Sequence, residues 1–474
     1  MISLDVLRGM YVRSPHWVRN VVSWPLSILP VSIQYGRQYK VWREKITVLR
    51  NDRELRVQYV KRSIIELLRK ASAAPYYRDM FKTIWGNDAP FFGEFDHKSW
   101  LNIPILDKMA IRENLQAFLA SPKANMDLIS TGGTSGHPIA FYVDKNRSVA
   151  EIAFCNDAWS VAGYVEGDTR CVFRGVLIQD VSSRFMEFEP ALRELRCSPF
   201  HLTKQPMDLY IKEIQKRQIR FIHGYPSAIS IFASHVALRG LAPFEQIEGI
   251  FPISEKLLPY QRCLLRNVFP RSVIVPFYGL SEKVAFATEV VGRPDAYEFN
   301  PIYGLAELVN DKGQIVTEPG QRGKIVGTGF ISVGMPFIRY DTEDEATLEQ
   351  APSPENGYVL TVRDIGSRWR QEFLVSTNGA LVSIAAINIH SQAYRSVREF
   401  QFYQDEPGRA LLRVILADGA TGAHAEVFAD EIRKKIAGSI DIAVELTDRI
   451  DATQRGKRKF IDQRISQLPL IDTG

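Results

Sequence analysis

Residues 130–138 read Ser-Thr-Gly-Gly-Thr-Ser-Gly-His-Pro and concentrate groups that can hold an anion. Glycines let successive backbone N–H groups turn toward one anion, and the hydroxyls of Thr131, Thr134 and Ser135 add donors. The spacing differs from G-x-x-x-x-G-K-[ST], so this is not a Walker phosphate loop. Glycine, serine and threonine also cluster in plain loops. Composition alone therefore leaves a phosphate site and a linker both open.

A second polar group follows the apolar run 273–275, in the sequence Pro-Phe-Tyr-Gly-Leu-Ser-Glu. We expect Tyr278, Ser281 and Glu282 to emerge at the carboxyl end of a parallel strand, where α/β sheets bind ligands. Tyr278 offers a flat face to an aromatic base, and Glu282 offers an oxygen ligand to Mg²⁺. The alternative is a buried tyrosine beside a solvated glutamate.

Two further segments are strongly charged. Residues 341–345 contain four carboxylates, which suit a solvated turn, although one carboxylate can also accept two hydrogen bonds from a sugar diol. Residues 453–465 contain five cations, which form either an anion-binding surface or a soluble end. A catalytic lysine among them would have to approach a phosphate or carboxylate whose charge grows in the transition state.

The elements that hold these segments follow from hydrophobic periodicity. An amphipathic helix is predicted from about residue 55 to 73, where apolar side chains recur at helical spacing at Val57, Val60, Ile64, Leu67 and Leu68. Residues 205–290 alternate helices with short apolar strands, which indicates a parallel α/β sheet. After about residue 310 the pattern is β, with Asn378-Gly379 as a hairpin turn. The last hundred residues suit a small α+β domain.

Composition places the chain among ordinary globular proteins. Its 474 residues are 45% hydrophobic and 24% charged, enough to bury a large core in two to four structural units. The four cysteines are far apart in sequence and form no C-x-x-C pair, so we expect neither a zinc knuckle nor a disulfide framework. A reducing cytoplasm fits this best.

The formal charge of +5 is unevenly placed, because residues 1–70 hold 14 Lys/Arg against 5 Asp/Glu. Within them, residues 21–33 are apolar but too short, at 13 residues, to span a bilayer. This extension is expected to pack on the main body, with peripheral contact to an anionic membrane face as the alternative. It carries no RNA-binding motif, so no nucleic-acid partner is expected.

In their order and spacing these motifs resemble the adenylate-forming superfamily, which includes acyl-CoA synthetases and adenylation domains. That family has a Ser/Thr/Gly loop ending in Lys-Pro, then Tyr-Gly-x-[ST]-Glu, Tyr-x-[ST]-Gly-Asp, a hinge and a C-terminal Gly-Lys. The chain is most similar to the phenylacetate-CoA ligase branch, and within it to the ligase-like subgroup of capsular polysaccharide biosynthesis. Segments 68–81 and 103–115 extend the likeness to nearly the whole chain.

The resemblance implies a fold and a set of site residues. The fold class is α/β, with a large N-terminal domain (1–365) of mixed and parallel sheets, flanking helices and a β-rich portion, and a small mobile α+β domain (366–474). Lys457 would be the catalytic lysine, and Glu282 would be catalytic and hold Mg²⁺. The residues implied for ATP are Ser130, Thr131, Gly132, Gly133, Thr134, Ser135, Gly136, His137, Tyr278, Gly279, Ser281, Asp344 and Arg368. The residues implied for the acyl substrate are His223, Gly224, Tyr225 and Pro226.

Within this set, Tyr278 would stack on adenine and Asp344 would bind the ribose. Arg368 lies near the hinge of the family, with Glu372 as the hinge residue. The chain departs from the family pattern at His137, where most members have lysine, and at Glu343, where they have glycine. The choice of Lys457 over Lys459 rests on the Gly-Lys match.

The resemblance implies a two-step reaction in which a carboxylate attacks the α-phosphate of Mg-ATP and a second nucleophile then takes the acyl group. The first step needs alignment and charge stabilisation rather than a nucleophilic side chain. The acceptor would be an amine, such as an amino sugar or amino acid, or CoA. The alternative is a degenerate homologue that binds a nucleotide or a partner protein without catalysis.

Overall fold

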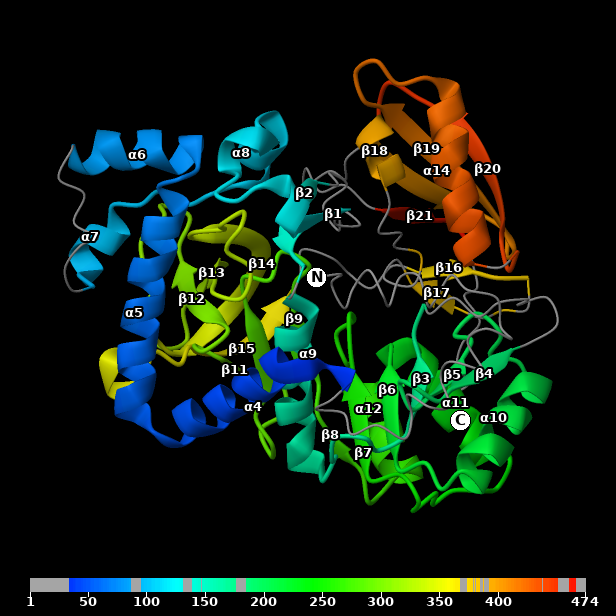
Figure 1. Ribbon diagram of the computed structural model, residues 1–474. Coiled ribbons are helices and arrows are strands. Elements are labelled where there is room, and N and C mark those ends of the chain that lie inside the picture. The colour runs from blue at the N-terminus through cyan, green and yellow to red at the C-terminus, as the bar shows by residue number, and fades with distance from the viewer. Residues whose placement is uncertain are drawn as a thin grey trace.

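In the part of the chain that it describes, the computed structural model forms three large sheets and two short hairpins, with helices packed around them (Figure 1). The residues that it describes are 34–86, 95–130, 139–145, 147–175, 185–366, 373–377, 379, 381–383, 387, 392–436, 438–450 and 460–465. Among the helices within these ranges, none is long and apolar enough to cross a membrane.

A six-stranded, mostly parallel sheet is built from the middle of the chain. Its strand order is β4-β5-β3-β6-β7-β8, and every neighbouring pair except β4 with β5 is parallel. The strands are β3 (Arg170–Phe173), β4 (Met186–Glu189), β5 (Glu194–Cys197), β6 (Phe221–Gly224), β7 (Gly249–Pro252) and β8 (Val273–Ile274). Every residue of β6 and β7 is buried, as in strands covered on both faces. The predicted parallel α/β sheet is confirmed.

Helices cover both faces of this sheet (Figure 1). They are α10 (Lys204–Lys216), α11 (Pro226–Leu238) and α12 (Pro259–Val268) on one face, and α4 (Gly36–Asn51) and α9 (Arg147–Trp159) on the other. Successive side chains of a strand point to opposite faces, so Ile222 packs with α10 and α11 whereas Phe221 packs with α9. His223 shares the face of Phe221, and its ring centroid lies 5.1 Å from that of Trp159.

An antiparallel seven-stranded sheet forms the β-rich part. Its order is β12-β13-β14-β15-β11-β10-β9. The strands are β9 (Phe277–Gly279), β10 (Phe286–Glu289), β11 (Ala296–Phe299), β12 (Gly304–Val309), β13 (Arg322–Gly329), β14 (Tyr340–Gln350) and β15 (Thr361–Gly366). The helices beside it are α5 (Arg53–Ala71), α6 (Pro75–Trp85), α7 (His97–Leu101) and α8 (Lys108–Glu113). Ile64 and Leu67 of α5 lie in the same apolar cluster as this sheet, which confirms the predicted amphipathic helix.

The apolar run 273–279 does not form the single strand that its pattern predicts. Pro276, which lacks an N–H, separates β8 in the parallel sheet from β9 in the antiparallel sheet. Tyr278 is therefore on the edge strand of the antiparallel sheet, paired with Ala287. Tyr278, Ser281 and Glu282 follow the carboxyl end of the parallel strand β8, as expected, but Tyr278 itself belongs to the other sheet.

The C-terminal part contains a hairpin and a four-stranded sheet. The hairpin pairs β16 (Phe373–Val375) with β17 (Leu381–Ser383), as predicted. The sheet has the order β20-β19-β18-β21, from β18 (Val397–Gln404), β19 (Arg409–Leu416), β20 (Asp441–Leu446) and β21 (Ile461–Gln463), with α14 (Gly422–Lys435) beside it. The buried amide of Gln404 accepts from Val375 N and donates to Val375 O at 2.7 and 2.8 Å, which ties the hairpin to β18. The domain boundary at residue 366 stays a prediction.

Candidate active site

A bulge in β14 places Asp344 beside Tyr278. Opposite Ile325, the register between β13 and β14 shifts, so that Thr342, Glu343 and Asp344 stand against one residue. Such a bulge bends the strand and redirects a side chain. Tyr278 donates its hydroxyl hydrogen to Asp344 Oδ2 at 2.9 Å, and one edge of its ring packs on Phe299. The phenol and the carboxyl group, 66 positions apart in sequence, thus form one unit.

Asp344 has an unusual proton affinity. Its pKa is raised from 3.8 to about 7, mainly by burial and to a lesser extent by the charges of Glu282 and Glu343. The hydrogen bond from Tyr278 and the positive charge of Lys108 act in the opposite direction. Burying an ionised carboxylate without hydrogen-bond partners is costly. A ligand that donates hydrogen bonds to Asp344 would therefore stabilise its ionised form.

Lys108 reaches this unit from a distant segment. Leu106 pairs with Tyr340 at the start of β14, and Asp107 caps α8 by accepting from Ala110 N at 2.8 Å. These contacts hold the buried Lys108 so that its Nζ lies 2.5 Å from Glu343 Oε2. Lys108 therefore supplies a cation next to the carboxyl group of Asp344.

Glu343 occupies a left-handed backbone position, with φ of 63°. Left-handed backbone favours glycine, the residue that the resemblance led us to expect here. The ion pair with Lys108 gives the Glu343 side chain a partner in this conformation. The glutamate that replaces the expected glycine at position 343 therefore has an ion-pair partner, Lys108, from a distant segment of the chain.

Glu282 is buried and held from one side. Tyr340 donates its hydroxyl hydrogen to Glu282 Oε1 at 2.9 Å. Burial and the charge of Glu282 raise the pKa of Tyr340 well above its ordinary value, so the phenol remains a donor. Within the described ranges, no group of three or more His, Cys, Asp or Glu side chains is placed to hold a metal ion. One carboxylate such as Glu282 fits Mg²⁺ that takes its other ligands from phosphates and water.

The glycine-rich loop follows directly from a hairpin that shares this core. Strands β1 (Met126–Ser130) and β2 (Ala140–Asp144) are antiparallel, with Ser130 opposite Ala140. Phe141 of β2 contacts Phe337, which in turn contacts Tyr340, with ring centroids 5.3 and 5.1 Å apart. The two ends of the loop are thus joined to the core that holds Glu282.

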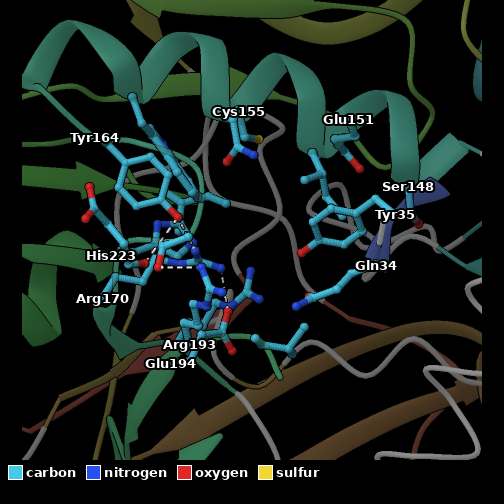
Figure 2. A pocket seen from close by; sticks show the side chains of 18 of the residues that line it. Gln34, Tyr35, Ser148, Glu151, Cys155, Tyr164, Arg170, Arg193, Glu194 and His223 are labelled. Carbon is cyan, nitrogen blue, oxygen red and sulfur yellow. Dashed lines mark hydrogen bonds and ion pairs between the residues drawn. The ribbon is translucent and has the colours of Figure 1, made fainter. Parts of the chain in front are cut away.

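His223 lines a cavity of about 390 Å³ between α9 and the parallel sheet (Figure 2). Its Nδ1 lies 2.9 Å from Phe251 O, where it can only donate, which leaves Nε2 as an acceptor. Burial and the charges of Arg174 and Arg170 lower the pKa of His223 to about 3. The imidazole is neutral throughout the physiological pH range.

The three residues after His223 shape the backbone. Tyr225 N donates to Phe173 O at 2.8 Å, and Pro226 begins α11. A Cβ on Gly224 would lie 2.1 Å from Phe173 O, so only glycine allows β6 to approach β3 this closely. Of the four residues expected around the acyl substrate, His223 is the one that lines the cavity.

The comparisons with known proteins agree with this architecture. A family model described as the CapK C-terminal domain matches residues 374–464. Protein CapK of Staphylococcus aureus is 23% identical over 367 residues, which cover 76% of this chain and 79% of that protein. Both matches agree with the resemblance to CapK-like proteins of the adenylate-forming superfamily.

One of two reported solved structures aligns well enough to show the same fold. The crystal structure of 2-hydroxyisobutyryl-CoA ligase with 2-HIB-AMP and CoA in the thioesterification state aligns with a TM-score of 0.51 and 16% identity, over 86% of this chain and 89% of that chain. An open conformation of the same ligase aligns with a TM-score of 0.49 and 16% identity, over 85% and 90% of the two chains. The α/β fold class expected for the superfamily is confirmed.

Several expected site residues of this CapK-like chain lie outside the described residues: Thr131, Gly132, Gly133, Thr134, Ser135, Gly136, His137, Arg368, Glu372, Lys457 and Lys459. Ser130 is described only as the last backbone position of β1. Gly279 ends β9 and Ser281 lies in the turn that follows it. The structure therefore brings together Tyr278, Glu282 and Asp344, and the roles of all the expected site residues stay predictions.

Sequence reasoning missed Lys108 and the charged wall of the cavity. Lys108 lies in segment 103–115, which resembles the ligase-like subgroup of capsular polysaccharide biosynthesis, but no local sequence pattern links it to Glu343. Cys171 and Cys197 were also treated as distant, yet their Sγ atoms lie 3.6 Å apart across neighbouring strands as free thiols.

Proposed function

We propose that this chain is an ATP-dependent ligase that activates a carboxylic acid as an acyl-adenylate and then transfers the acyl group. In the first step an oxygen of the acid attacks the α-phosphorus of ATP, and the bond to pyrophosphate breaks. In the second step an amine or CoA attacks the acyl carbon, and AMP leaves. We infer an amine acceptor, in polysaccharide or natural-product synthesis, from the resemblance to the ligase-like subgroup of capsular polysaccharide biosynthesis.

The unit formed by Asp344 and Tyr278 carries this proposal. A ribose offers two neighbouring hydroxyl donors, and an ionised carboxylate can accept both. In the free chain Asp344 has Tyr278 as its hydrogen-bond donor and a pKa of about 7. Two more donors would compensate its negative charge, so nucleotide binding and ionisation of Asp344 would favour each other.

The neighbouring residues suit the other parts of ATP. Tyr278 presents an aromatic ring for the adenine, and the backbone and hydroxyl groups of residues 130–137 would hold the phosphates. Glu282, oriented by Tyr340, is the carboxylate that would hold Mg²⁺, which lowers the charge repulsion at the phosphates. Lys457 would approach the α-phosphate from the C-terminal part during adenylation.

The test is ATP–pyrophosphate exchange measured across a panel of aryl, fatty, amino and dicarboxylic acids. We expect at least one acid to support exchange, Lys457→Ala to reduce it severely, and a preformed acyl-adenylate still to react in that variant. Glu282→Gln should raise the Mg²⁺ concentration needed for half-maximal exchange. Arg271→Gln, at an exposed position, is the control that should change neither.

Adding candidate amines or CoA then identifies the acceptor by release of AMP. If no acid in the panel supports exchange, and no pyrophosphate is released with amines and CoA present, the ligase is refuted. ATP binding without turnover would instead favour a degenerate homologue that keeps its nucleotide site.

A further inference from the structure

Two residues near the start of β14 combine a left-handed backbone with a long charged side chain. Arg339 directly precedes the strand and has φ of 50°, and Glu343 lies within it with φ of 63°. A non-glycine residue in this conformation is strained and persists only where the surrounding contacts fix the backbone. Tyr340, which donates to Glu282, lies between the two, and Asp344 follows directly. The backbone that carries these groups is therefore strained on both sides of Tyr340.

The side chain of Arg339 is held by a buried ion pair. Its Nε lies 3.2 Å from Glu307 Oε2 on β12, and the two side chains are only 3% and 4% exposed. Glu307 Oε1 also accepts from Trp100 Nε1 at 3.2 Å, which orients the carboxylate. Displacing the guanidinium would leave a buried carboxylate without its cation, which is costly. Arg339 is therefore fixed against β12.

The same arginine binds the segment of chain between α7 and α8. Arg339 Nη1 donates to Ile103 O at 2.7 Å and to Leu101 O at 3.3 Å. The backbone oxygen of Arg339 accepts from Leu106 N at 2.9 Å, and Asp341 N donates to Leu106 O at 2.9 Å. Side-chain and backbone hydrogen bonds together fix this segment to the first residues of β14.

Lys108, at the end of this segment, contacts the same strand a second time. The Nζ of this buried lysine lies 2.5 Å from Glu343 Oε2. The segment therefore bonds to Arg339 before Tyr340 and to Glu343 after it. Each of the two strained positions is held by an ion pair, one with β12 and one with the segment itself.

We propose that Arg339, Glu307, Lys108 and Glu343 form a clamp that holds Asp344 in position for the nucleotide. This inference rests on the proposed function and deepens it, because it names residues that act on ATP binding through Asp344. Arg339 fixes where the segment lies, and Lys108 fixes the strained backbone next to Asp344. A site that is ordered before ATP binds loses less conformational entropy on binding. Lys108 and Arg339 are positioning residues, and since they share one segment, loss of either releases the same constraint.

The test measures the binding of MgATP to the full chain by isothermal titration calorimetry, which needs no turnover. At pH 9 the carboxyl group of Asp344, with a pKa of about 7, is ionised, so that affinity reports its position rather than its protonation. Lys108→Met should weaken binding at least tenfold, and Lys108→Arg should stay within threefold of the wild type. Arg339→Lys keeps the charge but loses the forked guanidinium, and should weaken binding at least fivefold. Lys82→Met, at an exposed position of α6, is the matched control and should change nothing.

The double variant Lys108→Met/Arg339→Lys distinguishes one clamp from two independent contacts. If both residues act through one segment, its affinity should lie within twofold of that of Lys108→Met, whereas independent losses would multiply to about fiftyfold. In ATP–pyrophosphate exchange the variants should raise KM for ATP and leave KM for the acid within twofold. If Arg339→Lys gives no cooperative urea unfolding, Trp100→Phe replaces it, because that change removes one donor to Glu307 and keeps an aromatic ring. Trp100→Phe should weaken ATP binding at least twofold.

The outcomes separate this inference from the proposed function. Wild-type affinity in Lys108→Met or in the variant that replaces Arg339→Lys overturns the clamp, and so do multiplied losses in the double variant. An equal rise of KM for ATP and for the acid also overturns it, because the residues would then act on the fold as a whole. ATP binding by the wild type without exchange for any acid overturns the ligase and leaves the clamp. Absence of ATP binding by the wild type overturns both.

Discussion

Replacing Asp344 by asparagine is expected to stabilise the free protein at alkaline pH while weakening ATP binding. Burial raises the pKa of Asp344 from 3.8 to about 7. Because the folded-state pKa lies above the unfolded value, this group favours the folded state at acidic pH, and that contribution is lost as the pH rises from about 4 to about 7. Asparagine does not ionise, and its side-chain oxygen can still accept from Tyr278.

The size of the effect follows from the two pKa values. The difference between 3.8 and about 7 corresponds to about 4 kcal/mol of unfolding free energy once both states are ionised. At pH 5.5 only the unfolded state is ionised, and the cost to the wild type is about 2 kcal/mol. The advantage of Asp344→Asn should therefore grow by about 2 kcal/mol between pH 5.5 and pH 8.5.

Urea unfolding followed by tryptophan fluorescence at both pH values measures this difference. Asp311→Asn, in an exposed turn, is the control and should show the same offset from the wild type at pH 5.5 and 8.5. If Asp344→Asn also showed a pH-independent offset, Asp344 would ionise in its ordinary range, and the reasoning from its burial would be refuted. The affinity of the folded Asp344→Asn variant for ATP should fall at least tenfold, because an amide accepts hydrogen bonds less strongly than a carboxylate.

Three further outcomes are expected. Lys108→Met removes a positive charge that lowers the pKa of Asp344, so the pH at which kcat/KM for ATP is half-maximal should rise. Lys108→Arg should restore the wild-type midpoint. An unchanged midpoint in Lys108→Met would contradict this role. Iodoacetamide at pH 8 should rapidly add one group by intact mass, at the exposed Cys263, since the pKa of Cys155 is raised to about 12; rapid modification at Cys155 would disagree. Gly224→Ala should lower the unfolding free energy by about 3 kcal/mol in a thermal or urea melt, because the added methyl group meets the neighbouring strand; a wild-type melt would show that the strands can separate.

Local sequence patterns predict much of this fold. The spacing of Ile64 and Leu67 gives the helix α5, and Pro226 marks the beginning of α11. Both features depend on residues that are neighbours in sequence, where periodicity and backbone preference act directly. The order of apolar strands and helices likewise predicts the parallel sheet.

The rest of the site depends on contacts that no local pattern encodes. Lys108 meets Glu343 because Leu106 pairs with Tyr340, across more than 230 positions. The bulge that contains Asp344 is also set by the neighbouring strand rather than by its own sequence. A resemblance to a family supplied Tyr278, Glu282 and Asp344 as candidates, but only the packed chain brings their side chains together.

The two-sided segment 277–283 separates mutational effects that would otherwise be coupled. Phe277 and Lys283 line the cavity, whereas Tyr278 bonds to Asp344 and Glu282 to Tyr340. The resemblance implies that the acid binds beside His223, in the same cavity, so substitutions at Phe277 and Lys283 would alter which acid is accepted and leave the nucleotide residues in place. Directed evolution of a new acid preference should therefore begin at those two positions, and divergence among natural relatives can proceed there without loss of nucleotide chemistry.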